Sequence, residues 1–231
     1  MKKMNLNHFI EQVPLFAGLV DTQIQLLAAI VEKRKYLRGK VIFTEGEEAT
    51  GLYVLCAGRI KIYKLSSDGK EQILHILGPG EPFGEVTVFA GGQFPAYAEA
   101  LESCETLFFP RKKFVELITK DPSMAMNMLA MLSKRLRYFT QLVENLSLKE
   151  VPQRLAAYLL VLDNIKNKQD IVELDIAKGQ LASLLGTIPE TLSRILNKMS
   201  GQGYITVEGR QIRLLDRKSL ENISMGEKLL T

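Results

Sequence analysis

The spacing of apolar residues changes along the chain and divides it into helical and strand-like regions. Residues 1–35 have helical spacing, interrupted by Pro14 and Gly18. Across residues 36–109, short runs of β-branched and aromatic residues alternate with glycine turns. The helical period returns after Pro110. This order predicts an α+β chain in which a strand-rich domain is followed by a helical region.

The strand-rich region contains several short predicted strands. They lie at 41–43, 52–55, 60–63, 72–77 and 106–109. Asp68-Gly69, between the third and fourth of them, is a strong hairpin signal because both residues tolerate the backbone conformation of a tight turn. Short strands at intervals of roughly 8–12 residues are typical of antiparallel barrels and rolls. We therefore expect a closed or rolled antiparallel β domain.

A long helix is expected to follow this domain. It begins at Asp121-Pro122, where Asp suits the N-cap and Pro suits the first helical position. Its apolar residues recur at alternating intervals of three and four, which is the spacing of a coiled-coil seam. The seam consists of Leu129, Leu132, Leu136, Phe139, Val143 and Leu146. Because a helix leaving a β domain has little else to cover such a seam, we expect these residues to form a homodimer interface.

Two short helices joined by a tight turn are predicted within residues 178–199. The first ends at Gly186, which tolerates the left-handed conformation of a helix C-terminus. The second begins with Thr187 as N-cap, Pro189 in the first turn and Glu190 at the capping-box position. Two helices with this connection form the helix-turn-helix plan.

The outward face of the second helix carries side chains suited to reading DNA. Arg194 can make a bidentate contact with guanine, and Glu190 can accept from a cytosine amino group. Ser193 is small enough to let the helix approach the bases closely. Taken singly, Glu190 fits a pure capping role and Arg194 a solvated charge equally well.

A β-hairpin is predicted directly after this helix, over residues 204–215, and gives the unit the form of a winged helix. Arg210 lies at its turn, where it can reach a phosphate and position the protein without specifying sequence. The residues expected to contact DNA are Lys178, Gln180, Thr187, Glu190, Thr191, Ser193, Arg194 and Arg210.

Composition excludes several function classes. The net charge is +4, with a basic bias toward the C-terminal end that suits a phosphate backbone. Two cysteines cannot form an iron–sulfur cluster, and two histidines leave little material for a metal site built from side chains. The sequence shows no glycine-rich phosphate loop and no nucleophile elbow, so we do not expect an enzyme. It also shows no signal peptide and no apolar run of membrane length, so we expect a cytoplasmic protein without a membrane partner.

The chain resembles the CRP/FNR superfamily of bacterial regulators over nearly its whole length. The resemblance is carried by residues 52–61, by Phe83-Gly84-Glu85 and, most specifically, by residues 190–196. It implies a β-roll sensor domain at 1–120, a dimerisation helix and hinge at 121–150, and a winged helix-turn-helix at 151–231.

The same resemblance implies a target sequence. Glu190, Ser193 and Arg194 match the Glu-x-x-Ser-Arg pattern with which the FNR-type branch reads TTGAT-N4-ATCAA palindromes. The cyclic-AMP receptor branch instead begins this pattern with arginine, where this chain has Pro189. The implied partners are double-stranded DNA, a second copy of the chain and, for an activator, RNA polymerase.

The sensor domain departs from the cyclic-nucleotide pattern. Gly84 and Glu85 match the residues that hold the ribose, but Pro95-Ala96 replaces the Arg-Ser pair that holds the phosphate. On the long helix, Phe139-Thr140 replaces the polar pair that contacts adenine. A buried phosphate without a guanidinium partner is costly. Cyclic AMP is therefore an unfavoured effector, and Glu85 can instead serve as a structural hydrogen-bonding group in the roll.

The remaining similarity is to the Dnr/HcpR-like branch, whose members answer nitric oxide or nitrosative stress and are thought to bind haem. His75 and His8 are then the candidates for an axial ligand. A small organic effector in an apolar pocket stays open as an alternative. From a different class, a nucleotide-binding regulatory subunit that does not bind DNA also stays open.

Overall fold

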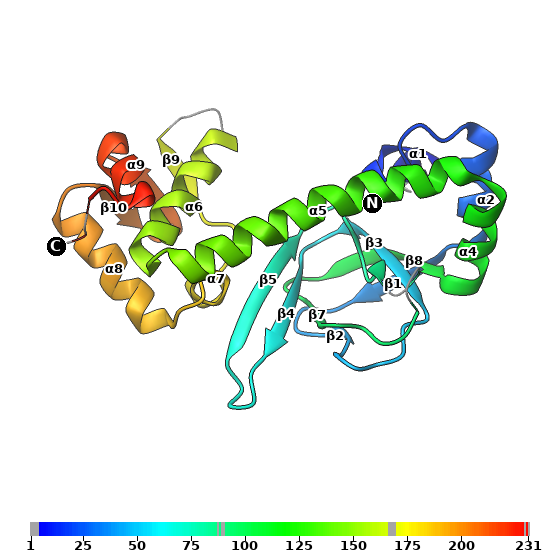
Figure 1. The fold of residues 1–231 in the computed structure, drawn as a ribbon, viewed down its shortest axis with the longest axis horizontal. Coiled ribbons are helices and arrows are strands. Elements are labelled where there is room, and N and C mark those ends of the chain that lie inside the picture. The colour runs from blue at the N-terminus through cyan, green and yellow to red at the C-terminus, as the bar shows by residue number, and fades with distance from the viewer. Residues whose placement is uncertain (1–4, 87, 89–90, 166–169, 229, 231) are drawn as a thin grey trace. The chain divides into compact units, whose positions relative to one another are not determined.

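The computed structural model describes residues 5–86, 88, 91–165, 170–228 and 230. The chain forms two compact units, Met1–Tyr138 and Phe139–Thr231. Helix α5 (Pro122–Leu148) runs through the boundary between them (Figure 1). The side chain of Asp121 accepts a hydrogen bond from the backbone N–H of Ser123, at 3.0 Å, which confirms the predicted helix start.

The first unit contains the expected β-roll. One antiparallel sheet has the order β1-β8-β3-β6 and the other has the order β2-β7-β4-β5. The strands are β1 (Glu32–Tyr36), β2 (Val41–Phe43), β3 (Gly51–Ala57), β4 (Ile60–Leu65), β5 (Glu71–Leu77), β6 (Pro82–Phe83), β7 (Tyr97–Ala100) and β8 (Cys104–Pro110). Aromatic side chains fill the interior of the roll, including a stack of Phe43 on Phe94 with ring centroids 3.7 Å apart.

Helices cover the outer face of the first sheet. They are α1 (Leu6–Gln12), the 3-10 turn η1 (Pro14–Phe16), α2 (Asp21–Ile30) and α4 (Arg111–Lys120). Figure 1 shows them grouped at one end of the roll. Phe16, Phe109 and Phe114 form a mutually contacting aromatic cluster there, with centroids 5.4–6.3 Å apart. Burial of this apolar surface fixes the helices on the sheet.

The prediction of helix up to residue 35 was wrong at its end, because Glu32–Tyr36 is strand β1. Its sequence is almost entirely polar and shows no alternating apolar pattern. The strand pairs antiparallel with β8, with Glu32 opposite Phe108, and the Arg34 guanidinium lies 3.5 Å from the centroid of the Phe108 ring. Backbone pairing and this cation–π contact stabilise the strand. Strands β6 and β7 were also not predicted.

The second unit has the winged-helix arrangement expected from the sequence. Its elements are α6 (Val151–Ile165), β9 (Ile171–Glu173), α7 (Lys178–Leu184), α8 (Pro189–Gly201), β10 (Ile205–Glu208), β11 (Gln211–Leu214) and α9 (Arg217–Met225). The three strands form one sheet in the order β10-β11-β9. The sequence patterns did not predict α9, which buries Leu220 and Ile223. None of the described helices is both long and apolar enough to cross a membrane.

Candidate nucleic-acid interface

Helix α8 has one buried face and one free face. Leu192, Ile195, Leu196 and Met199 are buried within the second unit. Glu190, Ser193 and Arg194 are exposed, and their side chains make no hydrogen bond or ion pair with any other described residue. The free side chains follow one another along the N-terminal half of the helix. The structure therefore leaves the predicted reading face available for contacts with a partner.

The turn between α7 and α8 is a Schellman motif. Gly186 has φ +65°. The Thr187 N–H donates to the Ala182 carbonyl at 2.9 Å, and the Gly186 N–H donates to the Ser183 carbonyl at 3.4 Å. These two bonds satisfy carbonyl groups that the end of α7 would otherwise leave unpaired. The glycine turn of the predicted helix-turn-helix is thereby confirmed.

The predicted N-cap of the second helix was wrong by one residue. The N-cap is Ile188, in extended conformation and without a side-chain cap bond, and Pro189 takes the first helical position. Ile188 takes the N-cap position because its carbonyl accepts the first intrahelical bond, from the Leu192 N–H at 3.1 Å. Ile188 itself is 50% exposed.

This one-residue shift frees Glu190 from the capping role. Glu190 is now the second helical residue, whereas a capping box requires the carboxylate at the third position. Its negative charge still lies in the first turn, where the helix dipole favours it. Glu190 therefore does not form a capping box, which was one of the two roles that its sequence position allowed.

The other predicted contact residues fall into two groups. Lys178 and Arg210 are exposed, whereas Thr187 and Thr191 are half-buried. Gln180 is also half-buried, and its Oε1 accepts a hydrogen bond from the Ala177 N–H at 2.9 Å. That bond stabilises the start of α7. The amide nitrogen of Gln180 can still donate to an outside partner.

The wing is a tight two-residue hairpin. Glu208 pairs with Gln211 across a loop that consists of Gly209 and Arg210. Gly209 has φ +61°, which suits the first loop position of a type II′ turn. The Leu174 N–H donates to the Arg210 carbonyl at 2.8 Å, so the loop is also tied to the segment after β9.

The apolar seam of α5 is largely uncovered in the single chain. Leu129, Leu136 and Val143 are 56%, 67% and 63% exposed, respectively. Leu132, Phe139 and Leu146 are half-buried. Large apolar side chains exposed at regular intervals along one helix mark a surface that a partner covers. An exposed apolar seam of this kind is expected for a dimerisation helix in a single chain, without the partner subunit.

On the roll side, Glu85 is paired with the long helix. Arg135 forms an ion pair with the Glu85 carboxylate and donates a hydrogen bond to the Pro82 carbonyl at 2.9 Å. The second carboxylate oxygen of Glu85 is buried without a hydrogen-bond partner among the described residues. The sequence reasoning did not identify Arg135. Arg135 lies between the seam positions Leu132 and Leu136, as Lys134 does, so no local pattern distinguishes it.

The other predicted pocket residues lie in both units. Gly84 has φ +72°, and Ala96 is 5% exposed. The Lys64 ammonium donates to the Pro95 carbonyl at 3.1 Å. Phe139 and Thr140 belong to the second unit. Their place in an effector pocket therefore stays a prediction.

The two histidines have different surroundings. His8 is exposed on α1 and contacts Gln12. His75 lies in β5, half-buried, with its Nε2 3.1 Å from Glu81 Oε1 and its ring edge-on to Tyr138. Burial alone would raise the pKa of Glu81, but hydrogen bonds from His75 and the Gly78 N–H outweigh it and hold that pKa below its usual range.

Comparison with known proteins agrees with this architecture. The model of the cyclic nucleotide-binding domain family matches residues 33–121, and that of the Crp-like helix-turn-helix domain family matches residues 153–223. The cyclic AMP receptor protein of Thermus thermophilus is 33% identical to this chain, over 92% of this chain and 97% of its own length.

Two solved structures extend the comparison. FixK2 from Bradyrhizobium japonicum is 28% identical with a TM-score of 0.72, over 84% of this chain and 97% of that one. DNR from Pseudomonas aeruginosa is 31% identical with a TM-score of 0.51, over 96% and 99% of the two chains. Both similarities extend over most of this chain. The chain belongs to the CRP/FNR family of DNA-binding transcription regulators.

Proposed function

We propose that this protein is a homodimeric regulator that reads a TTGAT-N4-ATCAA palindrome with helix α8. The observation that carries the proposal is the free polar face of α8, on which Glu190, Ser193 and Arg194 have no partner among the described residues. In this assignment Arg194 donates two hydrogen bonds to a guanine, and Glu190 accepts one from a cytosine amino group. Ser193 allows close approach of the helix to the bases.

Dimerisation supplies the second half-site. The six-residue seam of α5 pairs with the same seam of a second copy, as the exposure of Leu129, Leu136 and Val143 suggests. Two α8 helices about 34 Å apart then enter successive major grooves. The wing residue Arg210 contacts phosphate, and RNA polymerase is the further partner if the protein activates transcription.

The experiment measures fluorescence anisotropy of labelled duplexes with the full-length protein. The wild type is expected to prefer the palindrome over a scrambled duplex. Arg194→Ala is expected to lose about 1–3 kcal/mol of discrimination per half-site, which is roughly 5–150-fold, because a bidentate base contact is removed. Arg213→Ala removes an exposed arginine of β11 outside α8 and serves as the matched control. Retained discrimination in Arg194→Ala contradicts the assignment.

For the effector we propose nitric oxide or related stress, sensed through haem. The support is the resemblance to the Dnr/HcpR-like branch. His75 suits an iron ligand better than His8 does, because Glu11 and Gln12 occupy both ring nitrogens of His8, whereas Glu81 contacts only Nε2 of His75. Glu81 lies beside Nε2 of His75 and leaves Nδ1 as the ligating nitrogen. Haem would supply the site that binds the diatomic gas.

Effector binding acts on DNA affinity through the α5 pair. A ligand changes this equilibrium only by binding the DNA-competent arrangement better than the other one. Cyclic AMP is disfavoured because Pro95-Ala96 offers no guanidinium to its phosphate. A visible absorption spectrum of the haem-reconstituted protein tests the proposal.

We expect a Soret band that shifts with nitric oxide, changes in His75→Ala and persists in His8→Ala. Absence of the band favours a small organic effector instead.

A further inference from the structure

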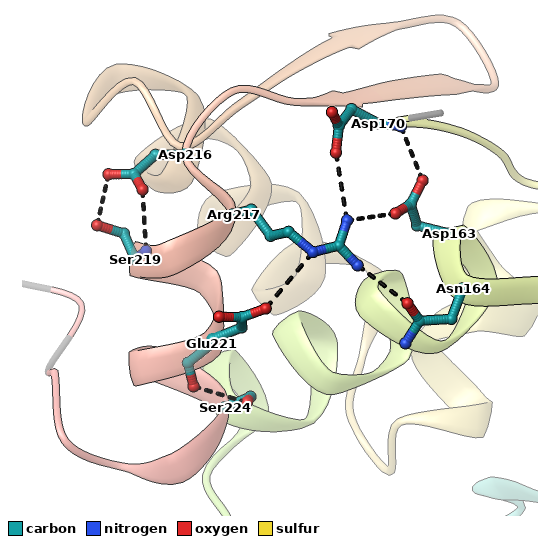
Figure 2. Close-up of polar contacts among 8 residues, drawn as sticks. All are labelled: Asp163, Asn164, Asp170, Asp216, Arg217, Ser219, Glu221 and Ser224. Carbon is teal, nitrogen blue, oxygen red and sulfur yellow. Dashed lines mark hydrogen bonds and ion pairs between the residues drawn. The ribbon is translucent and has the colours of Figure 1, made fainter. Parts of the chain in front are cut away.

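A buried carboxylate organises the base of the wing. Asp163 of α6 is 0% exposed and forms an ion pair with Arg217, the first residue of α9. Figure 2 shows the Arg217 guanidinium surrounded by acceptors from three segments. It donates to Asp170 Oδ1 at 3.2 Å and to Asn164 Oδ1 at 3.0 Å, and its Nε lies 3.4 Å from Glu221 Oε1. One side chain thus links α6, α9 and the residue before β9.

Asp170 is held in an unusual backbone conformation at this point. Its φ is +55°, and it is the one non-glycine residue with positive φ in the described part of the chain. Such a conformation costs on the order of 1 kcal/mol and persists where the surroundings fix it. Here the Asp170 N–H donates to Asp163 Oδ1 at 2.9 Å, while its carboxylate accepts from Arg217.

Strand β9 connects this cluster to the tip of the wing. At one end, the Leu214 N–H donates to the Asp170 carbonyl at 2.8 Å. At the other end, the Leu174 N–H donates to the Arg210 carbonyl, also at 2.8 Å. Between these bonds β9 pairs in register with β11. The strand is therefore a brace that begins at the Arg217 cluster and ends at the wing loop.

We propose that Arg217 is a positioning residue for DNA binding, because it holds the brace that places Arg210 against a phosphate. Arg217 itself does not reach the DNA in this assignment. The inference rests on the proposed function for its DNA step only. Its structural step, that Arg217 fixes the wing loop through Asp170 and β9, is testable in the free protein.

Three variants isolate this role. Arg217→Lys keeps a charge for Asp163 but lacks the wide planar guanidinium with which Arg217 reaches acceptors in all three segments. Asp170→Gly accepts the positive φ and removes only the side-chain contact with Arg217, so it leaves the buried pair intact. Glu221→Gln alters the exposed side of Arg217 without touching β9 and is the matched control.

Hydrogen exchange in the free, full-length protein tests the structural step. The Leu174 amide, which bonds to the Arg210 carbonyl, is expected to exchange at least fivefold faster in Arg217→Lys and Asp170→Gly than in the wild type. Glu221→Gln is expected to match the wild type. Equal exchange rates in all four proteins would overturn the proposal, because Arg217 would then not hold the wing loop.

The salt dependence of binding tests the DNA step. Each lost phosphate contact reduces the slope of log K against log salt by about 0.9, and a dimer has two wings. When the salt concentration rises from 50 to 200 mM, the affinity of each protein for the duplex falls. The fall should be about tenfold smaller for Arg210→Ala and for Arg217→Lys than for the wild type. The double variant should match the single ones, because both changes remove the same contact.

Two results would contradict the proposal at this step. One is an unchanged salt slope in Arg217→Lys. The other is a double variant in which the reduction of the slope equals the sum of the reductions in the two single variants. The ratio of specific to scrambled affinity should change little, since phosphate contacts carry no sequence information. A wild type that binds neither duplex contradicts the proposed function instead, and the exchange experiment still decides the role of Arg217.

Discussion

Arg135 of helix α5 forms an ion pair with Glu85, whose side chain is only 2% exposed, across 50 residues of sequence. The pair ties the long helix to the segment that follows β6. One oxygen of Glu85 remains without a partner among the described residues. Any group that binds near this carboxylate therefore acts directly on a contact of α5.

Removal of Arg135 is expected to destabilise the first unit. Arg135→Gln leaves the buried Glu85 carboxylate without its charge partner, which costs about 3–5 kcal/mol. Urea unfolding followed by a probe in the roll measures the change. The double variant Arg135→Gln/Glu85→Gln has no buried charge and should recover most of the loss. If the double variant is as unstable as the single one, the pairing does not account for the effect.

The Glu81–His75 contact predicts a pH dependence. Because the folded-state pKa of Glu81 is held below its ordinary value, the contact stabilises the roll above the ordinary carboxyl pKa. That stabilisation is lost as the pH falls through the lowered value. The pKa of Glu81 should rise in His75→Phe, which keeps a ring beside Tyr138 but removes the hydrogen bond.

NMR titration of the Glu81 carboxyl carbon measures both values. An identical pKa in the wild type and in His75→Phe would show that the imidazole does not set it.

The α5 seam predicts a dimer that a single charge weakens. Leu136→Glu places a carboxylate at a position that is 67% exposed in the single chain and covered in the dimer. Burial of two unpaired charges should cost about 3 kcal/mol or more, so the dimer dissociation constant should rise more than a hundredfold. Sedimentation velocity checks the result. Gln141→Glu, which is exposed and off the seam, should remain dimeric.

Gly186 and Gly179 predict opposite effects of the same substitution. Gly186→Ala forces alanine into φ +65° and should destabilise the second unit by about 1 kcal/mol. Gly179 lies in α7 with open space around the position of an added Cβ, so Gly179→Ala should stabilise it by about 0.5 kcal/mol. Thermal unfolding of both variants gives the comparison. The same sign of change in both would refute the Schellman assignment.

Much of the candidate interface could be predicted from local patterns. The alternation of buried and polar positions in α8 is a periodic signal, so the exposed face of Glu190, Ser193 and Arg194 followed directly from spacing. Gly186 indicated the turn because few other residues adopt the left-handed backbone conformation found there. The interval of three and four along α5 likewise marked the seam that the single chain leaves exposed.

The tertiary structure decided what no local pattern encodes. Glu32–Tyr36 has no apolar alternation and became a strand because β8 offers it a backbone partner. The N-cap is Ile188 and not Thr187, because Thr187 still belongs to the turn that closes α7 and the Ile188 carbonyl accepts the first bond of α8.

The pairs Glu85–Arg135 and Asp163–Arg217 join residues 50 and 54 positions apart. The sequence determined which faces are apolar and where the chain turns, because both depend on neighbouring residues. Which charges meet depends on how distant elements pack, and only the folded chain determines that.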